Sequence, residues 1–265
     1  MSLLDPIFSF GPLRKLAWKL WYPFLTEKLR NENTTFLNYA FEQDPPLGIP
    51  LNSSDELNRA CTQLYHHVAS QVNLAGKSVI EVSCGHGGGG SYIVRTLEPD
   101  NYIGLDLNPK GIAFCKKSHA AIKNLSFIQG DAQALPFEGN SKDAVINVEA
   151  SHCYPNFPGF LKEVHRVLKP GGHFLYADFR FAEKLDEWTD AINTCPLRTI
   201  QTRNISEEVL RGMDINSEKS KALVERLLPR VLQNIGRDFA AVRGSKVYES
   251  LRTGNMEYRS YCFQK

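Results

Sequence analysis

Residues 84–90, with the sequence CGHGGGG, could bring the backbone into close contact with a ligand. Glycine permits the tight turns and left-handed conformations that such a loop requires. A helix beginning in this segment would present unpaired backbone N–H groups to a negative group. Gly85, Gly87 and Gly90 also match the G-x-G-x-x-G dinucleotide fingerprint, so the loop alone leaves the identity of its ligand open.

Three carboxylates accompany this loop. Glu81 ends a β-branched run just before it, and Asp106 and Asp131 follow the next two apolar runs. Glu81 would repel a pyrophosphate but would suit a ligand that carries an ammonium and a sulfonium group. Asp106 is placed to accept hydrogen bonds from two ribose hydroxyls. Asp131, in a Gly-Asp-Ala sequence, would add a polar contact suited to an adenine amino group.

This order of acid, glycine loop, acid and Gly-Asp-Ala resembles the S-adenosylmethionine (SAM) sites of class I methyltransferases over residues 77–178. Ser83 stands where that pattern has its first glycine, and its small size makes the replacement tolerable. The resemblance implies SAM as the cofactor, with a nicotinamide dinucleotide as the alternative. The expected cofactor-binding residues are Tyr65, Glu81, Ser83, Gly85, Gly87, Asp106, Leu107, Asp131, Ala132 and Asn147.

The segment 147–155 follows a fourth apolar run and contains Glu149 and His152. Methyl transfer to oxygen requires an aligned nucleophile and a proton acceptor. A neutral imidazole can accept a hydroxyl proton near neutral pH. We therefore expect His152 to be the general base, Asp178 to orient its imidazole, and Glu149 to be a second acid near the reacting groups. The alternatives are a structurally hydrogen-bonded His152 and an Asp178 that caps a helix or turn.

Five short apolar runs must position these residues. The predicted strands are residues 77–82, 102–106, 125–129, 143–148 and 172–178. Helical stretches alternate with them, and the last, residues 160–168, is stopped by Lys-Pro-Gly-Gly at 169–172. This alternation predicts an α/β, Rossmann-like, doubly wound and mainly parallel sheet with its ligand crevice beyond the carboxyl ends of the strands. Residues 238–242 and 257–263 would add an antiparallel edge pair to complete seven strands.

We divide the chain into an N-terminal helical cap over residues 1–60 and a methyltransferase domain over residues 61–265. A helical insertion at about 181–236, including Trp188 and Met213, would form a lid together with the N-terminal helices. The first thirty residues combine aromatic side chains with basic flanks. That pattern suits a lid, a dimer contact or a helix at a membrane surface, and it leaves the oligomeric state open.

Length and composition exclude several classes of protein. The 265 residues are 42% hydrophobic, and 31 basic residues face 29 acidic ones, which excludes disorder and a nucleic-acid partner held by bulk charge. No apolar run reaches the roughly 18–20 residues that span a bilayer, and the N-terminus does not resemble a secretion signal. The six scattered cysteines predict free thiols, with no structural metal. We expect a soluble, cytoplasmic protein.

The chain as a whole is similar to one family. The similarity lies in residues 21–23, 41–46, 64–66, 81–89, 147–155 and 207–212, which resemble the phthiotriol/phenolphthiotriol dimycocerosate methyltransferases and related fatty-acid O-methyltransferases. The resemblance implies SAM-dependent methylation of a hydroxyl on an apolar lipid or polyketide in secondary metabolite biosynthesis. Departures lie in residues 1–20 and 181–205, where a lid would contact the substrate.

Two other functions stay open at this level. A C- or N-methyltransferase on the same fold would need no base, and His152 would then only shape the pocket. A nicotinamide-dependent oxidoreductase would use the G-x-G-x-x-G match, although Glu81 and Asp131 argue against it.

Overall fold

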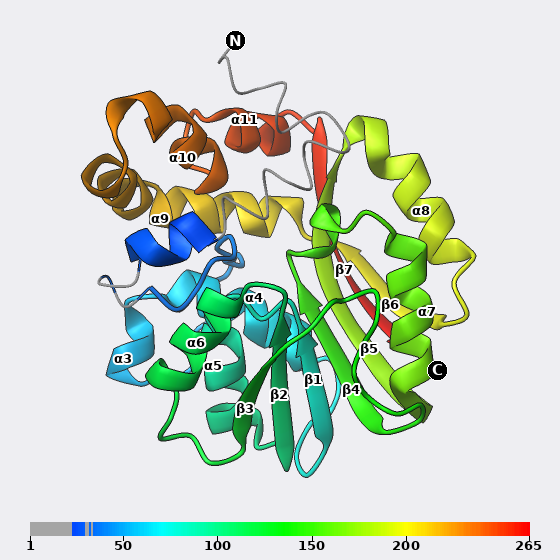
Figure 1. Cartoon of the computed structure of the whole chain (residues 1–265). Coiled ribbons are helices and arrows are strands. Elements are labelled where there is room, and N and C mark those ends of the chain that lie inside the picture. The colour runs from blue at the N-terminus through cyan, green and yellow to red at the C-terminus, as the bar shows by residue number, and fades with distance from the viewer. Residues whose placement is uncertain (1–22, 30–31, 33) are drawn as a thin grey trace.

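The computed structural model describes residues 23–29, 32 and 34–265, and its centre is a seven-stranded sheet with helices on both faces (Figure 1). The strands are β1 (Ser78–Val82), β2 (Asn101–Asp106), β3 (Leu125–Gln129), β4 (Lys142–Val148), β5 (Leu168–Phe181), β6 (Arg198–Asn204) and β7 (Met256–Gln264). Their order is β3-β2-β1-β4-β5-β7-β6. Strands β1 to β5 pair in parallel, and β7 runs antiparallel to β5 and β6. The expected mainly parallel, Rossmann-like sheet is confirmed.

Helices cover the two faces of the sheet and its carboxyl-terminal edge. They are α3 (Ser53–Glu56), α4 (Arg59–Ala69), α5 (Gly88–Leu97), α6 (Pro109–Ser118), α7 (Phe157–Val167), α8 (Leu185–Asn193), α9 (Ser206–Leu227), α10 (Gln233–Phe239) and α11 (Lys246–Arg252). Residues 23–29 are also helical. Helices α4, α5 and α6 pack on one face, α7 and α8 pack on the other, and α9, α10 and α11 lie across the top in Figure 1.

The core divides into two layers because neighbouring strand residues point to opposite faces. In β1, Val79 packs in the layer under α4, α5 and α6, whereas Ile80 and Val82 pack in the layer under α7 and α8. The same alternation governs Glu81, which lies on the face of Val79. This placement decides how far Glu81 can reach toward a ligand.

Of the edge pair expected at residues 238–242 and 257–263, the second strand is confirmed and the first is wrong. Strand β7 is present, but residues 238–242 form the end of α10 and the turn after it. The partner of β7 is β6, which lies inside the predicted helical insertion. Almost all of β6 is exposed and its sequence, RTIQTRN, is polar, so it lacks the alternation that identifies a half-buried strand.

Two residues expected in the lid belong to the core instead. Trp188 on α8 is buried against Tyr176 and Tyr261, and Met213 on α9 lies in the other core layer. Helices α10 and α11 cover the carboxyl edge of the sheet, and we call them the roof. Helix α11 lies outside the predicted range of 181–236.

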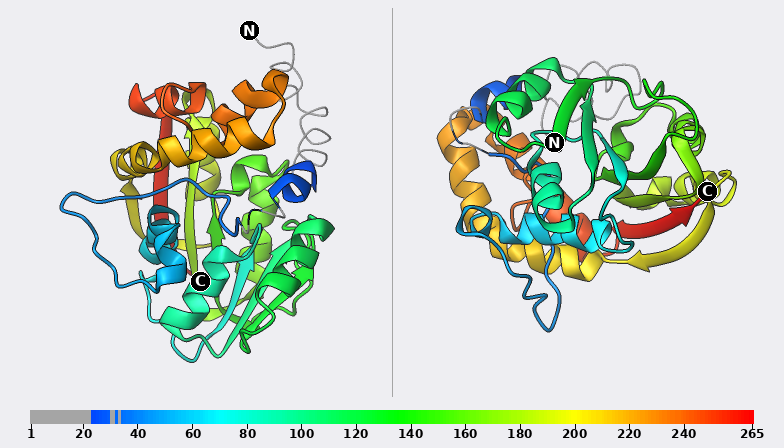
Figure 2. Two further views of the ribbon diagram at one scale, coloured as in Figure 1. Left: turned by 90° about the vertical axis from the view of Figure 1, so that its left-hand side faces the viewer. Right: turned by 90° about the horizontal axis from the view of Figure 1, so that it is seen from below.

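An extended segment, residues 34–52, passes between α4 and α9, where Ala40 and Phe41 are buried, and then loops out at the surface (Figure 2). It contacts the start of α5, where the Gly88 N–H donates to the Thr35 carbonyl at 3.0 Å. It also contacts α9, where the Glu42 N–H donates to the Glu208 carbonyl at 2.9 Å. Most of the N-terminal helical cap predicted for residues 1–60 lies outside the described residues or in this segment. Within the described part of the chain, no helix is both long and apolar enough to cross a bilayer.

Candidate active site

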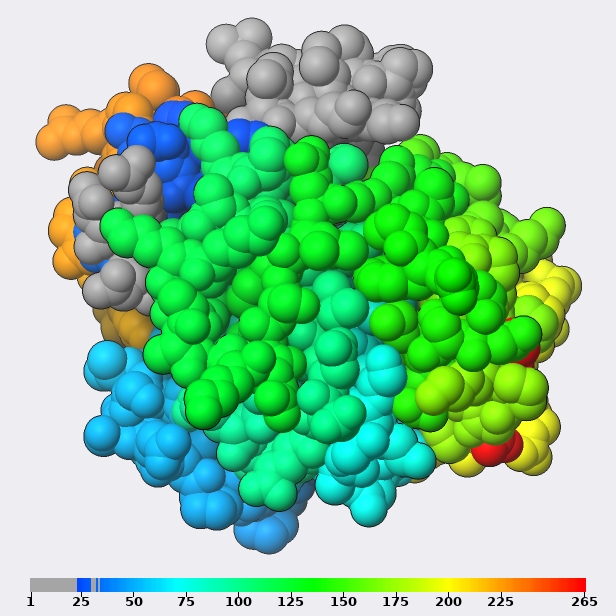
Figure 3. Space-filling model, turned by 60° about the horizontal axis from the view of Figure 1, so that its bottom comes forward, coloured from blue at the N-terminus to red at the C-terminus, as the bar shows by residue number. Residues whose placement is uncertain are grey.

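A cavity of about 1350 Å³ lies between the carboxyl ends of the strands and the roof. Ligand pockets usually measure about 300–1,000 Å³, so this cavity has room for a cofactor and a second molecule. Its inner wall is built by the residues at the ends of β1 to β5, and its outer wall by segment 34–39, α10 and α11. The opposite end of the molecule presents a closed surface of side chains (Figure 3).

The glycine loop turns sharply between β1 and α5. Ser83, Gly85 and Gly87 all have left-handed backbone conformations, with φ angles of 60°, 55° and 76°. The Asp106 carboxylate at the end of β2 holds the loop, because one oxygen accepts the Gly85 N–H at 2.9 Å and the other accepts the Asn108 N–H at 2.8 Å. A carboxylate offers about four acceptor positions, so Asp106 can also accept hydrogen bonds from a ligand.

Gly87 is required for two physical reasons, and its replacement by alanine is expected to destabilise the fold. The left-handed φ costs an L-residue about 1–2 kcal/mol, and a Cβ would lie 2.7 Å from the Phe127 ring, an overlap that adds about 1–3 kcal/mol. Gly171 is a matched control, because its φ is 78° but a Cβ there would meet no atom within 4 Å. Urea unfolding should show a clearly larger loss of unfolding free energy for Gly87→Ala than for Gly171→Ala, and equal losses would contradict the steric argument.

The predicted cofactor residues fall into two groups. Those that line the cavity are Tyr65, Ser83, Gly85, Asp106, Leu107, Asp131 and Ala132. The other three, Glu81, Gly87 and Asn147, lie behind its wall and are not among the lining residues. Asn147 is fully buried and donates to the Val82 carbonyl at 2.8 Å and to the Tyr154 hydroxyl at 2.9 Å, so it supports the wall.

Glu81 is fully buried between two tyrosines. It accepts hydrogen bonds from the Tyr65 hydroxyl at 2.8 Å and from the Tyr102 hydroxyl at 2.9 Å. From the sequence this carboxylate is expected to face the ligand, but it lies on the same face of β1 as Val79, and strand alternation directs it under α4 and α5. Burial raises the pKa of Glu81 to about 7, although both tyrosines act to lower it.

Replacing Glu81 with glutamine is expected to remove a pH-dependent loss of stability. The folded pKa of about 7 exceeds the ordinary 4.5, so the wild type loses stability as the pH rises between these values. The shift corresponds to about 3 kcal/mol. In urea unfolding, the free energy of unfolding of Glu81→Gln relative to that of the wild type should therefore increase as the pH rises from 5 to 8. The exposed Glu187→Gln serves as a control, and a pH-independent difference for Glu81→Gln would contradict the argument.

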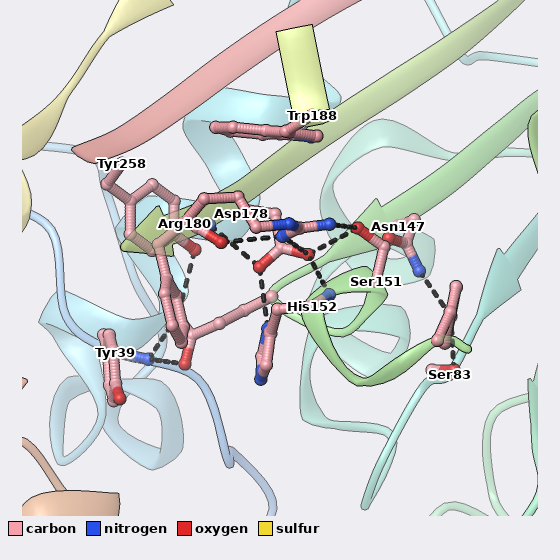
Figure 4. Close-up of polar contacts among 12 residues, drawn as sticks. Tyr39, Ser83, Asn147, Ser151, His152, Asp178, Arg180, Trp188 and Tyr258 are labelled. Atoms are coloured by element: carbon pink, nitrogen blue, oxygen red, sulfur yellow. Dashed lines mark hydrogen bonds and ion pairs between the residues drawn. The ribbon is translucent and has the colours of Figure 1, made fainter. Parts of the chain in front are cut away.

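His152 lines the cavity and contacts the fully buried Asp178 (Figure 4). His152 lies in a short 3-10 turn after β4, and its Nδ1 is 2.8 Å from Asp178 Oδ1. An ionised carboxylate can only accept, so Nδ1 carries a proton and the lone pair of a neutral imidazole is on Nε2. Figure 4 shows the second ring nitrogen pointing away from Asp178. The Phe179 ring stacks on the imidazole at 4.3 Å and fixes its plane.

Asp178 is completely buried and surrounded by donors. Its oxygens accept the His152 N–H at 2.9 Å, the Ser151 hydroxyl at 2.6 Å and the Phe179 N–H at 2.8 Å, and Arg180 Nη1 lies at 3.1 Å. Burial alone would raise the pKa of Asp178, but the charges of His152 and Arg180 lower it well below its usual range. For His152, by contrast, burial lowers the pKa, but the neighbouring Cys153 and Asp178 outweigh burial and raise that pKa to about 10.

Glu149 also lines the cavity and has the strained φ of 52°. Its carboxylate accepts the Tyr39 N–H at 2.9 Å and the Tyr258 hydroxyl at 3.0 Å (Figure 4). Burial raises the pKa of Glu149 to about 8, although the Tyr39 N–H and the charge of His152 act to lower it. Glu149 thus ties segment 34–52 to the start of β7 beside His152.

The outer part of the cavity was largely missed by sequence reasoning. It is lined by Leu37, Phe179, Phe181, Ile235, Phe239 and Val247, with Lys184 and Lys246 among them. These apolar side chains come from segment 34–52, β5, α10 and α11, which are far apart in the sequence. Only the aromatic alternation of Phe179 and Phe181 could have indicated such a wall. This part can hold a large apolar molecule.

The charge of the inner part favours a cationic or neutral ligand. The ends of β1 to β4 and the loops after them contribute Asp106, Asp131 and Glu149 to the lining of the described cavity, and no lysine or arginine. Arg180 at the end of β5 also lines the cavity, but its charge is paired with Asp178, so it offers little to offset the charge of a dinucleotide pyrophosphate that would meet these acids. A ligand with a ribose and a positive charge fits this set of acceptors.

Comparison with known proteins gives a family and close relatives. Residues 73–231 match the family model described as "Methyltransferase domain". A phthiotriol/phenolphthiotriol dimycocerosates methyltransferase from Mycobacterium leprae is 51% identical over 95% of this chain and 93% of its own length. A fatty-acid O-methyltransferase from Mycolicibacterium smegmatis is 49% identical over 94% of this chain and 90% of its own length.

Among solved structures, the [4+2]-cyclase SpnF superimposes with a TM-score of 0.71 at 17% identity, covering 93% of this chain and 94% of that chain. This likeness concerns the fold alone. Because the matching fold carries the name of a cyclase, the reaction must be argued from the site and from the closer relatives.

Proposed function

The chain belongs to the methyltransferase domain family as a SAM-dependent enzyme, and we propose that it methylates a hydroxyl oxygen of a lipid or polyketide-type natural product. The observation that carries the choice of oxygen is the His152–Asp178 contact of 2.8 Å in the cavity wall. Methylation of a hydroxyl requires removal of its proton, whereas a carbon or nitrogen nucleophile need not have a base at this position.

The inner part of the cavity fits SAM. Asp106 would accept hydrogen bonds from the ribose hydroxyls, Asp131 would face the adenine amino group, and the loop at Ser83 and Gly85 would let the methionine part approach the backbone. When bound, SAM supplies an electrophilic methyl group attached to a sulfonium. The acidic lining of the inner part is compatible with that positive charge.

His152 would accept the proton of the acceptor hydroxyl at Nε2. Asp178 keeps the Nδ1 proton in place and stabilises the imidazolium that results. Because the pKa of His152 is raised to about 10, the base is deprotonated only as the pH rises above the ordinary histidine range. We propose for Glu149 a supporting role, since its carboxylate holds Tyr39 and Tyr258 beside the reacting groups.

The acceptor is proposed to be an apolar molecule that carries a hydroxyl. The relatives are named for phthiotriol and phenolphthiotriol dimycocerosates and for fatty acids, which are long-chain compounds. The outer wall, with Phe179, Phe181 and Phe239, offers the apolar surface that such a chain requires. We also propose that the protein works in the cytoplasm. A peripheral contact with a membrane would involve residues 1–20, which lie outside the described residues.

Incubation with SAM carrying a trideuterated methyl group tests this proposal. The acceptors would be a long-chain secondary alcohol and its O-methyl ether, which differ only in the availability of the hydroxyl. We expect labelled methyl ether from the alcohol and no labelled product from the ether, as judged by mass spectrometry. Labelled product from the ether would place the methyl group on carbon, contradict O-methylation and support the C-methyltransferase alternative.

A further inference from the structure

Arg180 lies beside Asp178, also lines the cavity, and has no assigned role. We propose that Arg180 is a positioning residue that keeps His152 available as a base by sharing the negative charge of Asp178. This inference deepens the proposed function and depends on His152 being the proton acceptor.

The guanidinium is held in one place by several contacts. Arg180 follows Asp178 by two residues in β5, so both side chains project from the same face of the strand. Its Nη1 lies 3.1 Å from Asp178 Oδ2 and donates to the Phe179 carbonyl at 2.6 Å, and its Nη2 donates to the Ser151 hydroxyl at 2.9 Å. The side chain is only 10% exposed.

Aromatic rings enclose the guanidinium on the remaining sides. Its carbon lies 4.8 Å from the centre of the Trp188 ring and 5.3 Å from that of Phe157 (Figure 4). Cation–π attraction is strongest in such a desolvated place. The Trp188 indole in turn donates to the Tyr176 hydroxyl at 3.0 Å, and that hydroxyl lies 2.7 Å from Ser151 Oγ. Packing in the core therefore holds the positive charge of Arg180 beside Asp178.

This arrangement determines what happens when His152 loses a proton. With Arg180 in place, Asp178 stays paired with a positive charge after the imidazolium becomes neutral. Without Arg180, a neutral imidazole would leave the fully buried Asp178 carboxylate with no counter-charge among the described residues that pair with it. A buried carboxylate without a counter-charge is costly, so the imidazole would retain its proton to higher pH.

Other titratable groups near His152 remain the same when Arg180 is changed. Its own loop contributes Glu149 and Cys153, segment 34–52 contributes Tyr39, and β7 contributes Tyr258. Burial raises the pKa of both tyrosines well above the usual value, so they stay neutral over the range in which His152 titrates. A change in the proton affinity of His152 on replacing Arg180 can therefore be assigned to the loss of the Arg180 charge beside Asp178.

The experiment compares Arg180→Gln with Arg180→Lys in the full-length protein. Titration of the His152 Cε1 proton by NMR, assigned by its absence from the His152→Asn spectrum, reports the pKa without substrate or cofactor. Arg180→Gln should raise that pKa by about one unit, because a nearby like charge disfavours the protonated imidazolium and its removal reverses that effect. Arg180→Lys keeps the charge and should titrate like the wild type. The acidic limb of kcat/KM against pH should follow the same order.

An unchanged His152 titration in Arg180→Gln, together with lower activity, would show a structural role only and overturn the inference. If Arg180→Gln does not fold, Arg180→Lys decides, because a titration shifted upward despite the retained charge would also overturn it. The NMR result does not depend on the acceptor. Failure of O-methylation with the expected titration shift would therefore refute the proposed function and leave the charge-sharing intact.

Discussion

Replacing His152 with alanine is expected to lower kcat/KM for a hydroxyl acceptor by about 10²–10⁴-fold, the usual contribution of a positioned general base. The loss should appear in the rate of methyl transfer, because removing the proton acceptor leaves Asp106 and Asp131, the proposed cofactor contacts, in place. Calorimetric titration with SAM should therefore give the same Kd for the variant and the wild type. The rise of activity with pH that reflects the raised pKa of His152 should disappear in the variant.

A histidine outside the cavity provides the control. His165 lies on α7 and is not among the cavity-lining residues, so His165→Ala should turn over at the wild-type rate. Wild-type turnover by His152→Ala would remove His152 from the mechanism, and an equal loss of SAM binding would show that the variant disturbs the whole site.

The second large effect concerns Asp106. Asp106→Ala should weaken SAM binding by about 10–100-fold, because hydrogen bonds to a charged acceptor are worth about 1.5–3 kcal/mol each. Asp106 also anchors the glycine loop through the Gly85 N–H, so the ribose contribution must be separated from this anchoring. An analogue of SAM without the 2′-hydroxyl achieves this separation, because the variant and the analogue remove the same contact.

We expect the analogue to bind the wild type more weakly than SAM does and to lose less affinity than SAM when Asp106 becomes alanine. Asp131→Ala is the matched control. Its carboxylate accepts the Gln133 N–H at 2.9 Å, and no hydrogen bond joins it to the glycine loop, so the discrimination between SAM and the analogue should stay at the wild-type value. Equal losses for both ligands in Asp106→Ala would assign the effect to the loop and contradict the ribose contact.

The sequence predicted those parts of the fold whose periodicity is strong. Strands β1 to β5 contain short apolar runs that pack into the two core layers, and their ends agree closely with the structure apart from β5, which begins at Leu168 and extends to Phe181. Strand β6 could not be found in this way, because a polar edge strand owes its place to pairing with β7 and not to its own pattern.

The contact between His152 and Asp178 could be anticipated because both residues follow adjacent parallel strands, whose carboxyl ends lie at one edge. Glu81 shows the limit of that reasoning, since one position within a strand decides whether a carboxylate faces the ligand or the core. Arg180 gave no separate signal, because an arginine two residues after an acid is common on exposed strands. Its role depends on Phe157 and Trp188, which only the tertiary structure brings together.

The most direct test of a base-assisted O-methylation compares two acceptors with the same alkyl chain, one ending in a secondary hydroxyl and the other in a carboxylate. A hydroxyl must lose its proton to react, whereas a carboxylate is already ionised near neutral pH. The measured quantity is the ratio of kcat/KM for the wild type to that for His152→Ala with each acceptor. The account predicts a ratio of about 10²–10⁴ for the hydroxyl and a far smaller ratio for the carboxylate. Equal ratios for the two acceptors would show that His152 positions the substrate without accepting its proton, and would contradict the central claim.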